Sequence, residues 1–137
     1  MSYYCQRKTA TSFPILSIKN LILYDNKVIN VAKNKYDLLA TLIKISGKSY
    51  QIISLFSIVW INFTINKSST TNIQFKSLNK EIIHYFIKYQ MTNKNYSLYS
   101  IYENIALLIS NIKGSYSNVI GIPVKEILEC LCNIGYF

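Results

Sequence analysis

The 137-residue sequence predicts a mixed α+β fold in one domain, or in one domain with an extension. Some apolar runs alternate with polar residues at every second position, as half-buried strands do, whereas others recur every three or four positions, as amphipathic helices do. Strands and helices do not alternate regularly along the sequence, so a parallel sheet is not predicted. We therefore expect a β-hairpin with mixed helices and strands in the N-terminal two thirds, followed by a helix, strand, helix unit.

The chain is expected to begin with a polar, basic and extended arm over residues 1–13. Two apolar runs follow, residues 21–24 and 28–31, separated by Asp25, Asn26 and Lys27. Asn and Asp tolerate the left-handed backbone that tight turns require, so this pattern predicts a hairpin with a three-residue turn.

A helix is expected after the hairpin, because Asn34 followed by Asp37 is typical of a helix N-terminus. Gly47 predicts its end. The expected apolar face consists of Leu38, Leu39, Leu42 and Ile43.

The next region is ambiguous, because its apolar period changes within one run. Residues 52–59 fit a helix, whereas residues 59–65 alternate and favour a strand. A flexible loop is expected over residues 68–72, then a short strand over 73–75, and then a helix that begins near Ser77.

Residues 91–95 are polar and predict a hinge. Ser100 and Glu103 form a capping-box pattern, which predicts a helix over residues 101–113 that ends at Gly114. An extended stretch over 119–123 and a last helix from Val124 complete the unit. The expected organisation is an arm (1–13), an α+β extension of unknown family (14–95) and an α-β-α module (96–137).

Composition favours an anionic partner. Lys and Arg number 15 against 6 Asp and Glu, which gives a formal net charge of +9. An AT-rich genome explains abundant Lys, Ile, Asn and Tyr, but it explains the shortage of Asp and Glu less readily. Nucleic acid or an anionic membrane surface is therefore the expected partner class.

The sequence predicts no catalytic centre, cofactor or metal. Phosphate-binding loops, a nucleophile elbow and zinc-protease motifs are all missing from it. Cys5, Cys130 and Cys132 lack zinc-ligand spacing and are interpreted as buried or half-buried free thiols in a reducing compartment. His84 lies four residues from both Lys80 and Lys88, which makes it a poor general base.

A membrane span is not expected, and the N-terminus lacks the apolar core of a secretory signal. Residues 49–66 carry no charge, but they hold too many polar side chains for a stable span.

Basic residues interleaved with Tyr and Asn predict binding to nucleic acid. Lys neutralises phosphates, and Tyr rings stack on unpaired bases. The predicted contacts are Arg7 and Lys8 in the arm, Lys88 and Lys94 near the hinge, and Asn111, Lys113 and Tyr116 after it, with Lys27, Lys33 and Lys35 around the hairpin.

Residues 105–137 resemble the N-terminal half of the bacterial-type small-subunit ribosomal protein S-eight. The resemblance rests on one set of residues, namely Ile105-Ala106, Leu108-Ile109-Ser110, Ile112-Lys113, Ile122-Pro123, Lys125 and Gly135-Tyr136-Phe137. The loop and second helix are shorter than in that family, Gly114 replaces an asparagine, and residues 1–95 match nothing. The resemblance implies Asn111, Lys113 and Lys125 as phosphate contacts and a second polypeptide that completes the C-terminal sheet.

Together these observations favour a structural, non-enzymatic constituent of an organellar small ribosomal subunit, expected to be mitochondrial. Its partners would be ribosomal RNA and neighbouring ribosomal proteins. One alternative is a small nucleic-acid-binding protein of a virus or mobile element, with residues 77–90 and 100–113 as a helix pair. A second alternative is a subunit of a membrane complex anchored by residues 52–65.

Overall fold

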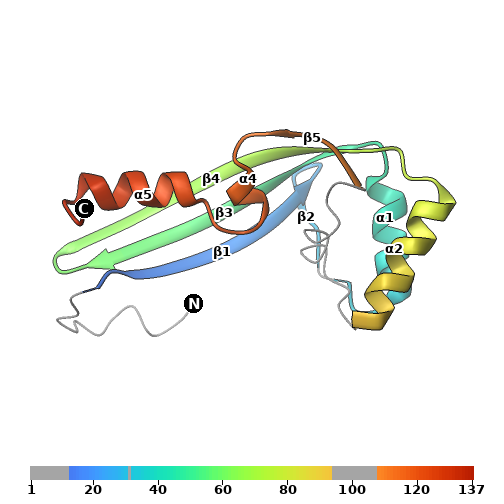
Figure 1. Ribbon diagram of the computed structural model, residues 1–137, viewed down its shortest axis with the longest axis horizontal. Helices are drawn as coiled ribbons and strands as arrows, with labels where there is room; N and C mark the ends of the chain where they lie inside the picture. Colours follow the sequence, from blue (N-terminus) through green and yellow to red (C-terminus); the bar gives the residue numbers. More distant parts are fainter. Residues whose placement is uncertain (1–12, 31, 94–107) are drawn as a thin grey trace.

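The computed structural model describes residues 13–30, 32–93 and 108–137. It confirms the mixed α+β class, because helices pack on one antiparallel sheet of strand order β2-β1-β3-β4-β5 (Figure 1). The strands are β1 (Ile15–Tyr24), β2 (Lys27–Val28), β3 (Ser49–Trp60), β4 (Phe63–Phe75) and β5 (Ile109–Lys113), and the helices are α1 (Lys35–Ile45), α2 (Lys80–Asn93), α4 (Tyr116–Val119) and α5 (Val124–Asn133).

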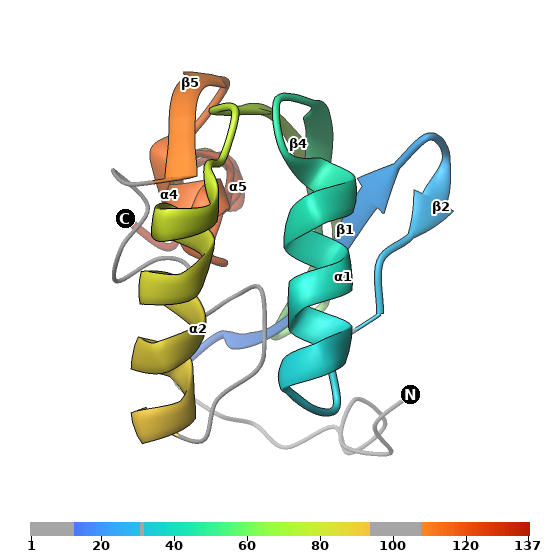
Figure 2. The ribbon, with the colours of Figure 1, turned by 90° about the vertical axis from the view of Figure 1, so that its right-hand side faces the viewer.

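Helices cover the sheet at two places. The short helix α4 and the helix α5 lie over the face of the long strands, whereas α1 and α2 lie side by side at one end (Figures 1 and 2). A large core cluster fills the α1 and α2 end, with Leu38, Leu42 and Phe86 among its members. A smaller cluster lies under α5, where Phe56 and Ile58 meet Ile127 and Cys130.

The long hairpin of β3 and β4 is the centre of the fold. Tyr50, Ile52, Ser54 and Phe56 are buried on the helix side of β3, while the residues between them are exposed or half-buried. This alternation is typical of an antiparallel sheet with one solvated face. We call that solvated face the outer face.

Two expectations for this hairpin are wrong. Residues 52–59 are strand and not helix, and the expected loop over 68–72 lies inside β4. Ser68 to Asn72 pair in register with Leu55 to Gln51 of β3. The ladder hydrogen bonds therefore override the turn preference of a Ser- and Thr-rich stretch.

The expected hairpin near residue 25 is confirmed, although its turn is one residue shorter. Leu23 pairs with Val28 and Tyr24 with Lys27, which leaves a two-residue turn. Asp25 and Asn26 both have positive φ, at 51° and 57°. A turn of this kind matches the right-handed twist of paired strands.

The two expected helices before residue 95 are confirmed with shifted ends. The Asn34 side chain caps α1 by accepting from the backbone N–H groups of Tyr36 and Asp37. In α2, the Asn79 side chain accepts from the Ile82 N–H at 2.8 Å. The expected hinge from residue 91 starts too early, because α2 continues to Asn93.

The last third differs most from expectation. Of the helix expected over 101–113, residues 101–107 lie outside the described part, and Ile109–Lys113 is strand β5. Ile112 of β5 pairs with Ile73 of β4, so edge pairing decides the conformation. The extended stretch expected over 119–123 is also wrong, because α4 and a turn occupy this region, whereas the last helix is confirmed as α5.

The pairing of β5 with β4 joins segments from both sides of residue 96 in one sheet. The basic arm lies outside the described residues, and the division into arm, extension and module stays a prediction. Residues 49–66, considered as a membrane anchor, form β3 and the start of β4. Within the described ranges, no helix has the length and apolar character needed to cross a membrane.

Candidate functional site

Residues 114–123, here called the anchor segment, fold back onto the helix-covered face of the sheet. Asn118 is fully buried at its centre. Its Nδ2 donates to the Ile52 carbonyl at 3.4 Å, to the Ser69 carbonyl at 3.2 Å and to the Thr71 hydroxyl at 3.0 Å. One side-chain amide therefore ties the anchor segment to both β3 and β4.

The start of the anchor segment touches Thr71 directly. The Ser115 N–H donates to the Thr71 Oγ1 at 3.2 Å, and the Thr71 hydroxyl donates back to the Ser115 carbonyl at 3.3 Å. Gly114 has a φ of +133°, and a Cβ there would lie 2.8 Å from the Thr71 Oγ1. Glycine is required at this position by both conformation and space.

A layer of polar side chains continues beneath the segment. Asn20 donates to the Gly121 carbonyl at 2.9 Å and accepts from Ser54. Ser69 donates to the Glu126 Oε1 at 2.7 Å. We call this set the polar layer, and its members are Asn20, Ser54, Ser69, Thr71, Asn118 and Glu126.

Two oxygens of the polar layer are buried without a hydrogen-bond partner, namely Asn118 Oδ1 and Glu126 Oε2. The remaining polar atoms of the layer hold the anchor segment and α5 on the sheet. Buried, directional hydrogen bonds of this kind fix position. The polar layer is therefore a support for the fold.

The second polar region is a pocket of about 430 Å³ between the β1–β2 hairpin and α1. Figure 2 shows this hairpin beside α1. We call it the lysine pocket, and it is lined by Tyr24, Lys27, Val28, Ile29, Asn30, Ala32, Lys33, Asp37, Ala40, Thr41 and Lys44.

The lysine pocket concentrates positive charge around one ring. The Lys44 Nζ lies 5.5 Å from the Tyr24 ring centroid, and the Nζ of the neighbouring Lys48 lies 5.3 Å from it. Lys27, Lys33 and Lys44 are exposed, and no described carboxylate forms an ion pair with them. The pocket therefore has free ammonium groups to offer an anion.

Tyr24 also connects the lysine pocket to the core, because its ring packs edge-on against Tyr50 at 6.3 Å. Burial raises the pKa of the Tyr50 hydroxyl far above its usual value, and the nearby Tyr24 adds to this rise. Tyr50 therefore stays neutral, and its buried hydroxyl has no hydrogen-bond partner.

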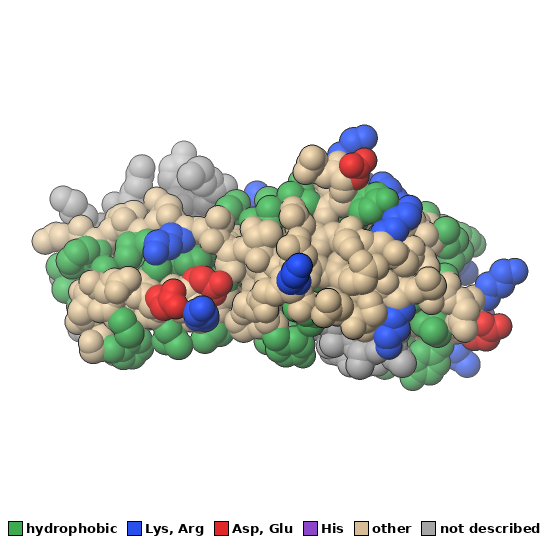
Figure 3. Space-filling model, turned by 90° about the horizontal axis from the view of Figure 1, so that it is seen from above, with side chains coloured by type: hydrophobic (Ala, Val, Ile, Leu, Met, Phe, Trp, Pro, Cys, Tyr) green, Lys and Arg blue, Asp and Glu red, His purple; other side chains and the backbone are tan. Residues whose placement is uncertain are grey.

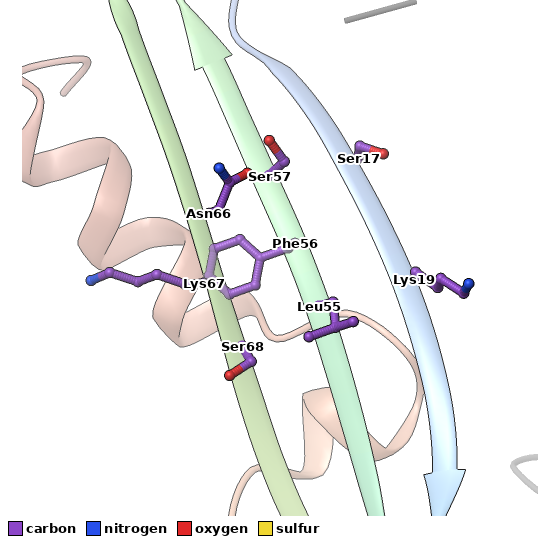
Figure 4. Close-up of a pocket in the computed structure, with 8 residues that line it drawn as sticks. All are labelled: Ser17, Lys19, Leu55, Phe56, Ser57, Asn66, Lys67 and Ser68. Atoms are coloured by element: carbon purple, nitrogen blue, oxygen red, sulfur yellow. The ribbon is translucent and has the colours of Figure 1, made fainter. Parts of the chain in front are cut away.

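A shallower hollow of about 400 Å³ lies on the outer face, across β1, β3 and β4 (Figure 4). Ser17, Ser57 and Asn66 form one row across the three strands, and Lys19, Leu55 and Ser68 form the next. Lys67 also borders the hollow, but it alternates to the other face and extends towards α5. We call this the outer hollow, and it offers one ammonium group.

The structure scatters the residues predicted to bind RNA. Arg7, Lys8 and Lys94 lie outside the described residues. The others are Lys88 on α2, Asn111 and Lys113 on β5, Tyr116 on α4, and Lys125 on α5, where its Nζ lies 3.9 Å from the Glu129 carboxylate. No observation tests their contact with a ligand, so these assignments stay predictions.

Sequence reasoning grouped Lys27 and Lys33 around the hairpin but missed Tyr24 and Lys44 as their neighbours. One signal was present in the sequence. Asp37, Thr41 and Lys44 follow one another at helical spacing, which places their side chains on one face of α1. Asn118 was also missed as a buried anchor. The capping pattern of Ser115 and Asn118 three residues apart could have indicated the start of α4.

Candidate metal ligands are sparse. In residues 13–30, 32–93 and 108–137, no three His, Cys, Asp or Glu side chains gather as a metal-binding group. Cys130 and Cys132 are free thiols as expected, but only Cys130 is buried, and the exposure of Cys132 contradicts the expectation that both thiols would be at least half-buried. Cys5 lies outside the described residues.

The fold and sites define an α+β protein on one antiparallel sheet, with a cationic pocket suited to an anionic ligand. In Figure 3 most of the Lys side chains drawn in blue lie over the half of the molecule that carries α1 and α2. The family model described as "Maf-like protein" matches residues 6–134. The chain belongs to the Maf-like protein family.

Its relatives carry an enzyme name. A protein named dTTP/UTP pyrophosphatase from Thermosipho africanus is 27% identical over 121 residues, which cover 88% of this chain and 63% of the relative. Its namesake from Thermosipho melanesiensis is 29% identical, covering 85% of this chain and 64% of the relative. One from Neisseria meningitidis is 22% identical, covering 99% and 68%. The chain thus spans less than two thirds of the first two relatives.

These findings correct the functional interpretation. The resemblance to ribosomal protein S-eight is wrong, because the family match covers nearly the whole chain, including residues 105–134. The same match contradicts the expected ribosomal role and the expected RNA and ribosomal-protein partners. It also contradicts the two alternatives, the nucleic-acid-binding protein and the membrane-complex subunit. The non-enzyme prediction is contradicted by the relatives' names, and the mitochondrial location by relatives that come from bacteria and archaea.

Proposed function

We propose that this chain binds nucleoside triphosphates and acts in the release of pyrophosphate from them. The observation that carries the proposal is the match of the family model to residues 6–134. The relatives' shared name, dTTP/UTP pyrophosphatase, supplies the substrate class. The protein's net charge of +9 supports an anionic substrate.

The proposed reaction is hydrolysis of the bond between the α- and β-phosphates. Water attacks the α-phosphorus, the α–β anhydride bond breaks, and the products are a nucleoside monophosphate, pyrophosphate and a proton. Positive side chains favour such a reaction by holding the phosphates and by stabilising the charge that develops on the leaving pyrophosphate. Lysine ammonium groups are suited to this task.

The test is direct product analysis. The purified chain is incubated with dTTP or UTP and Mg²⁺, and nucleotides and pyrophosphate are separated by anion-exchange chromatography. We expect the monophosphate and pyrophosphate to appear in equal amounts and in proportion to protein concentration. A folded protein, verified by circular dichroism, that yields no product above a heat-denatured control would overturn the proposed reaction.

Base preference is measured in the same assay by replacing dTTP with dATP or dGTP. The relatives' name leads us to expect higher kcat/KM for dTTP and UTP than for the purine nucleotides. Equal values for all four nucleotides would contradict a substrate class shared with the relatives.

A further inference from the structure

We propose that the lysine pocket binds the polyphosphate tail of the nucleotide, and that it does so without contacting the base. This inference rests on the proposed function for the identity of the ligand. It goes further by assigning the tail to one place, the surface between the β1–β2 hairpin and α1. Lys27, Lys33 and Lys44 supply the binding charge there.

The lining of the lysine pocket carries an excess of positive charge. Three lysines and one aspartate line the lysine pocket. The aspartate is already engaged, because the Asp37 Oδ2 accepts from the Lys33 backbone N–H at 3.2 Å and from the Asn34 Nδ2 at 3.4 Å. Its carboxylate belongs to the start of α1, and the three ammonium groups remain available.

A second observation is that positive charge extends past the lining itself. Lys44 lies at the end of α1 and Lys48 in the loop before β3, and their ammonium groups lie 5.5 and 5.3 Å from the centroid of the Tyr24 ring. A cation over an aromatic ring gains about 0.5 to 1 kcal/mol at an exposed site. Lys48 therefore adds positive charge beside the lining residue Tyr24, and this charge favours an anion with several negative charges.

The start of α1 is not the anion-binding group. The backbone N–H groups of Tyr36 and Asp37, which an anion at a helix N-terminus would use, already donate to the Asn34 side chain at 2.9 and 3.0 Å. Binding must therefore come from the lysine side chains. Lysine ammonium groups at the ends of flexible side chains bind phosphates well but do not distinguish one base from another.

The described lining of the lysine pocket has little free aromatic surface for the base. Tyr24 is the one aromatic side chain in the lining, and its ring is packed edge-on against Tyr50 and lies close to two ammonium groups. Little of this ring is left for stacking on a nucleobase. We expect the affinity of the lysine pocket to follow the number of phosphates, in the order triphosphate, diphosphate, monophosphate.

The experiment compares two double variants that remove the same charge. Lys33→Gln with Lys44→Gln removes two ammonium groups from the lysine pocket, and Lys19→Gln with Lys67→Gln removes two that border the outer hollow. Inorganic tripolyphosphate is titrated into each protein by calorimetry at low salt. We expect the first pair to weaken binding at least about tenfold and the second pair less than about twofold.

Three further readouts sharpen the result. Lys33→Arg with Lys44→Arg should restore most of the affinity, because the charge returns. The factor lost on Lys33→Gln with Lys44→Gln should be the same for dTTP, UTP and tripolyphosphate. A clearly larger loss for the nucleotides would overturn the claim that the base lies outside the pocket. Equal losses in both double variants would overturn the site itself, because they would show that only the overall charge matters.

Failure of this inference differs from failure of the proposed reaction. Selective loss of tripolyphosphate binding in a protein that hydrolyses neither dTTP nor UTP would support the lysine pocket and contradict the reaction. Hydrolysis with unchanged kcat/KM in Lys33→Gln with Lys44→Gln would support the reaction and contradict the pocket.

Discussion

The anchor segment and the lysine pocket both depend on polar side chains, but these side chains are in opposite environments. Asn118 is fully buried and donates to three acceptors on β3 and β4. The lysines of the pocket are exposed, and no described carboxylate neutralises them. The side-chain donor of Asn118 is satisfied inside the protein, although its Oδ1 has no partner, whereas the lysine pocket presents ammonium groups that no described carboxylate pairs with.

This difference separates stability from binding. A buried donor that is removed leaves its acceptors without partners, which costs about 1 to 3 kcal/mol for each group. An exposed lysine that is removed changes stability by less than about 0.5 kcal/mol, because water already solvates it. Substitutions in the anchor segment should therefore change the free energy of unfolding, and those in the lysine pocket should change ligand affinity.

The largest effect is expected for Asn118→Ala. The carbonyls of Ile52 and Ser69 lose their side-chain donor in a buried site, so we expect a loss of about 3 kcal/mol in the free energy of unfolding. Chemical denaturation measures it. Asn111→Ala, at an exposed position of β5, is the matched control and should cost less than about 0.5 kcal/mol. Similar costs for the two would contradict the role of the anchor.

A somewhat smaller loss is expected for Gly114→Ala. The new Cβ would lie 2.8 Å from the Thr71 Oγ1 and 3.1 Å from the Thr71 Cα, at a φ of +133°. We expect a cost of about 2 kcal/mol, measured by thermal or chemical unfolding. Gly135→Ala serves as control, because its φ is also positive at +77° but no atom lies within 4 Å of the added Cβ. Its expected cost is about 1 kcal/mol, and an equal cost at both sites would show that space at Thr71 is unimportant.

Tyr50→Phe tests the buried hydroxyl of the ring that packs against Tyr24 of the lysine pocket. The Tyr50 hydroxyl is buried without a partner, so its removal should stabilise the protein by about 1 kcal/mol at neutral pH. Destabilisation at neutral pH would indicate that the hydroxyl does have a partner.

The same variant tests the pH dependence of stability. The folded pKa is raised above the unfolded value of about 10, so the stability contribution is complete below about pH 10. It falls by about 1.4 kcal/mol per pH unit as pH rises further, because only the unfolded state releases the proton. Denaturation between pH 9 and about pH 11 should show this loss in the wild type and not in Tyr50→Phe. Tyr116→Phe, which alters an exposed ring, should keep the loss.

The smallest stability effect is expected for Lys33→Gln. Its ammonium group forms no ion pair with a described carboxylate, so the free energy of unfolding should change by less than about 0.5 kcal/mol. Salt should have little influence on this stability difference, whereas tripolyphosphate binding should weaken in the same variant. A loss above about 1 kcal/mol would contradict the division between a supporting region and a binding region.

Much of the local structure was predictable where a short pattern determines it. Asn34 and Asp37 indicated the start of α1, and Asp25 with Asn26 indicated the hairpin turn, because caps and tight turns depend on neighbouring residues. The helix after Pro123 was indicated in the same way. These elements needed no knowledge of distant contacts.

Other elements depended on pairing that the sequence does not display. Ser68 to Asn72 resemble a loop but extend β4, because β3 offers a continuous ladder. Ile109 to Lys113 continue a helical pattern but form β5, because the edge of β4 is free to pair with them. Strand pairing brings in partners tens of residues away, and no local propensity reports them.

The candidate site was predictable only in its charge. The excess of Lys and Arg over Asp and Glu predicted an anionic partner, but the RNA contacts were chosen from residues that the fold keeps apart. The grouping of Tyr24 with Lys44 requires the hairpin to lie against α1. The ribosomal resemblance assumed a helix through residues 109–113 and an extended stretch over 119–123, whereas β5 occupies the first of these and α4 with a turn occupies the second.

The sequence by itself determined the mixed α+β class, the caps and turns, and the positive charge, because each follows from composition or from residues close in the chain. The tertiary structure decided that Asn118 is a buried anchor and that Lys27, Lys33 and Lys44 line one pocket with Tyr24. Burial and charge convergence depend on distances between segments far apart in sequence. Those distances are set by the sheet, whose register is fixed by the packing of one face against helices.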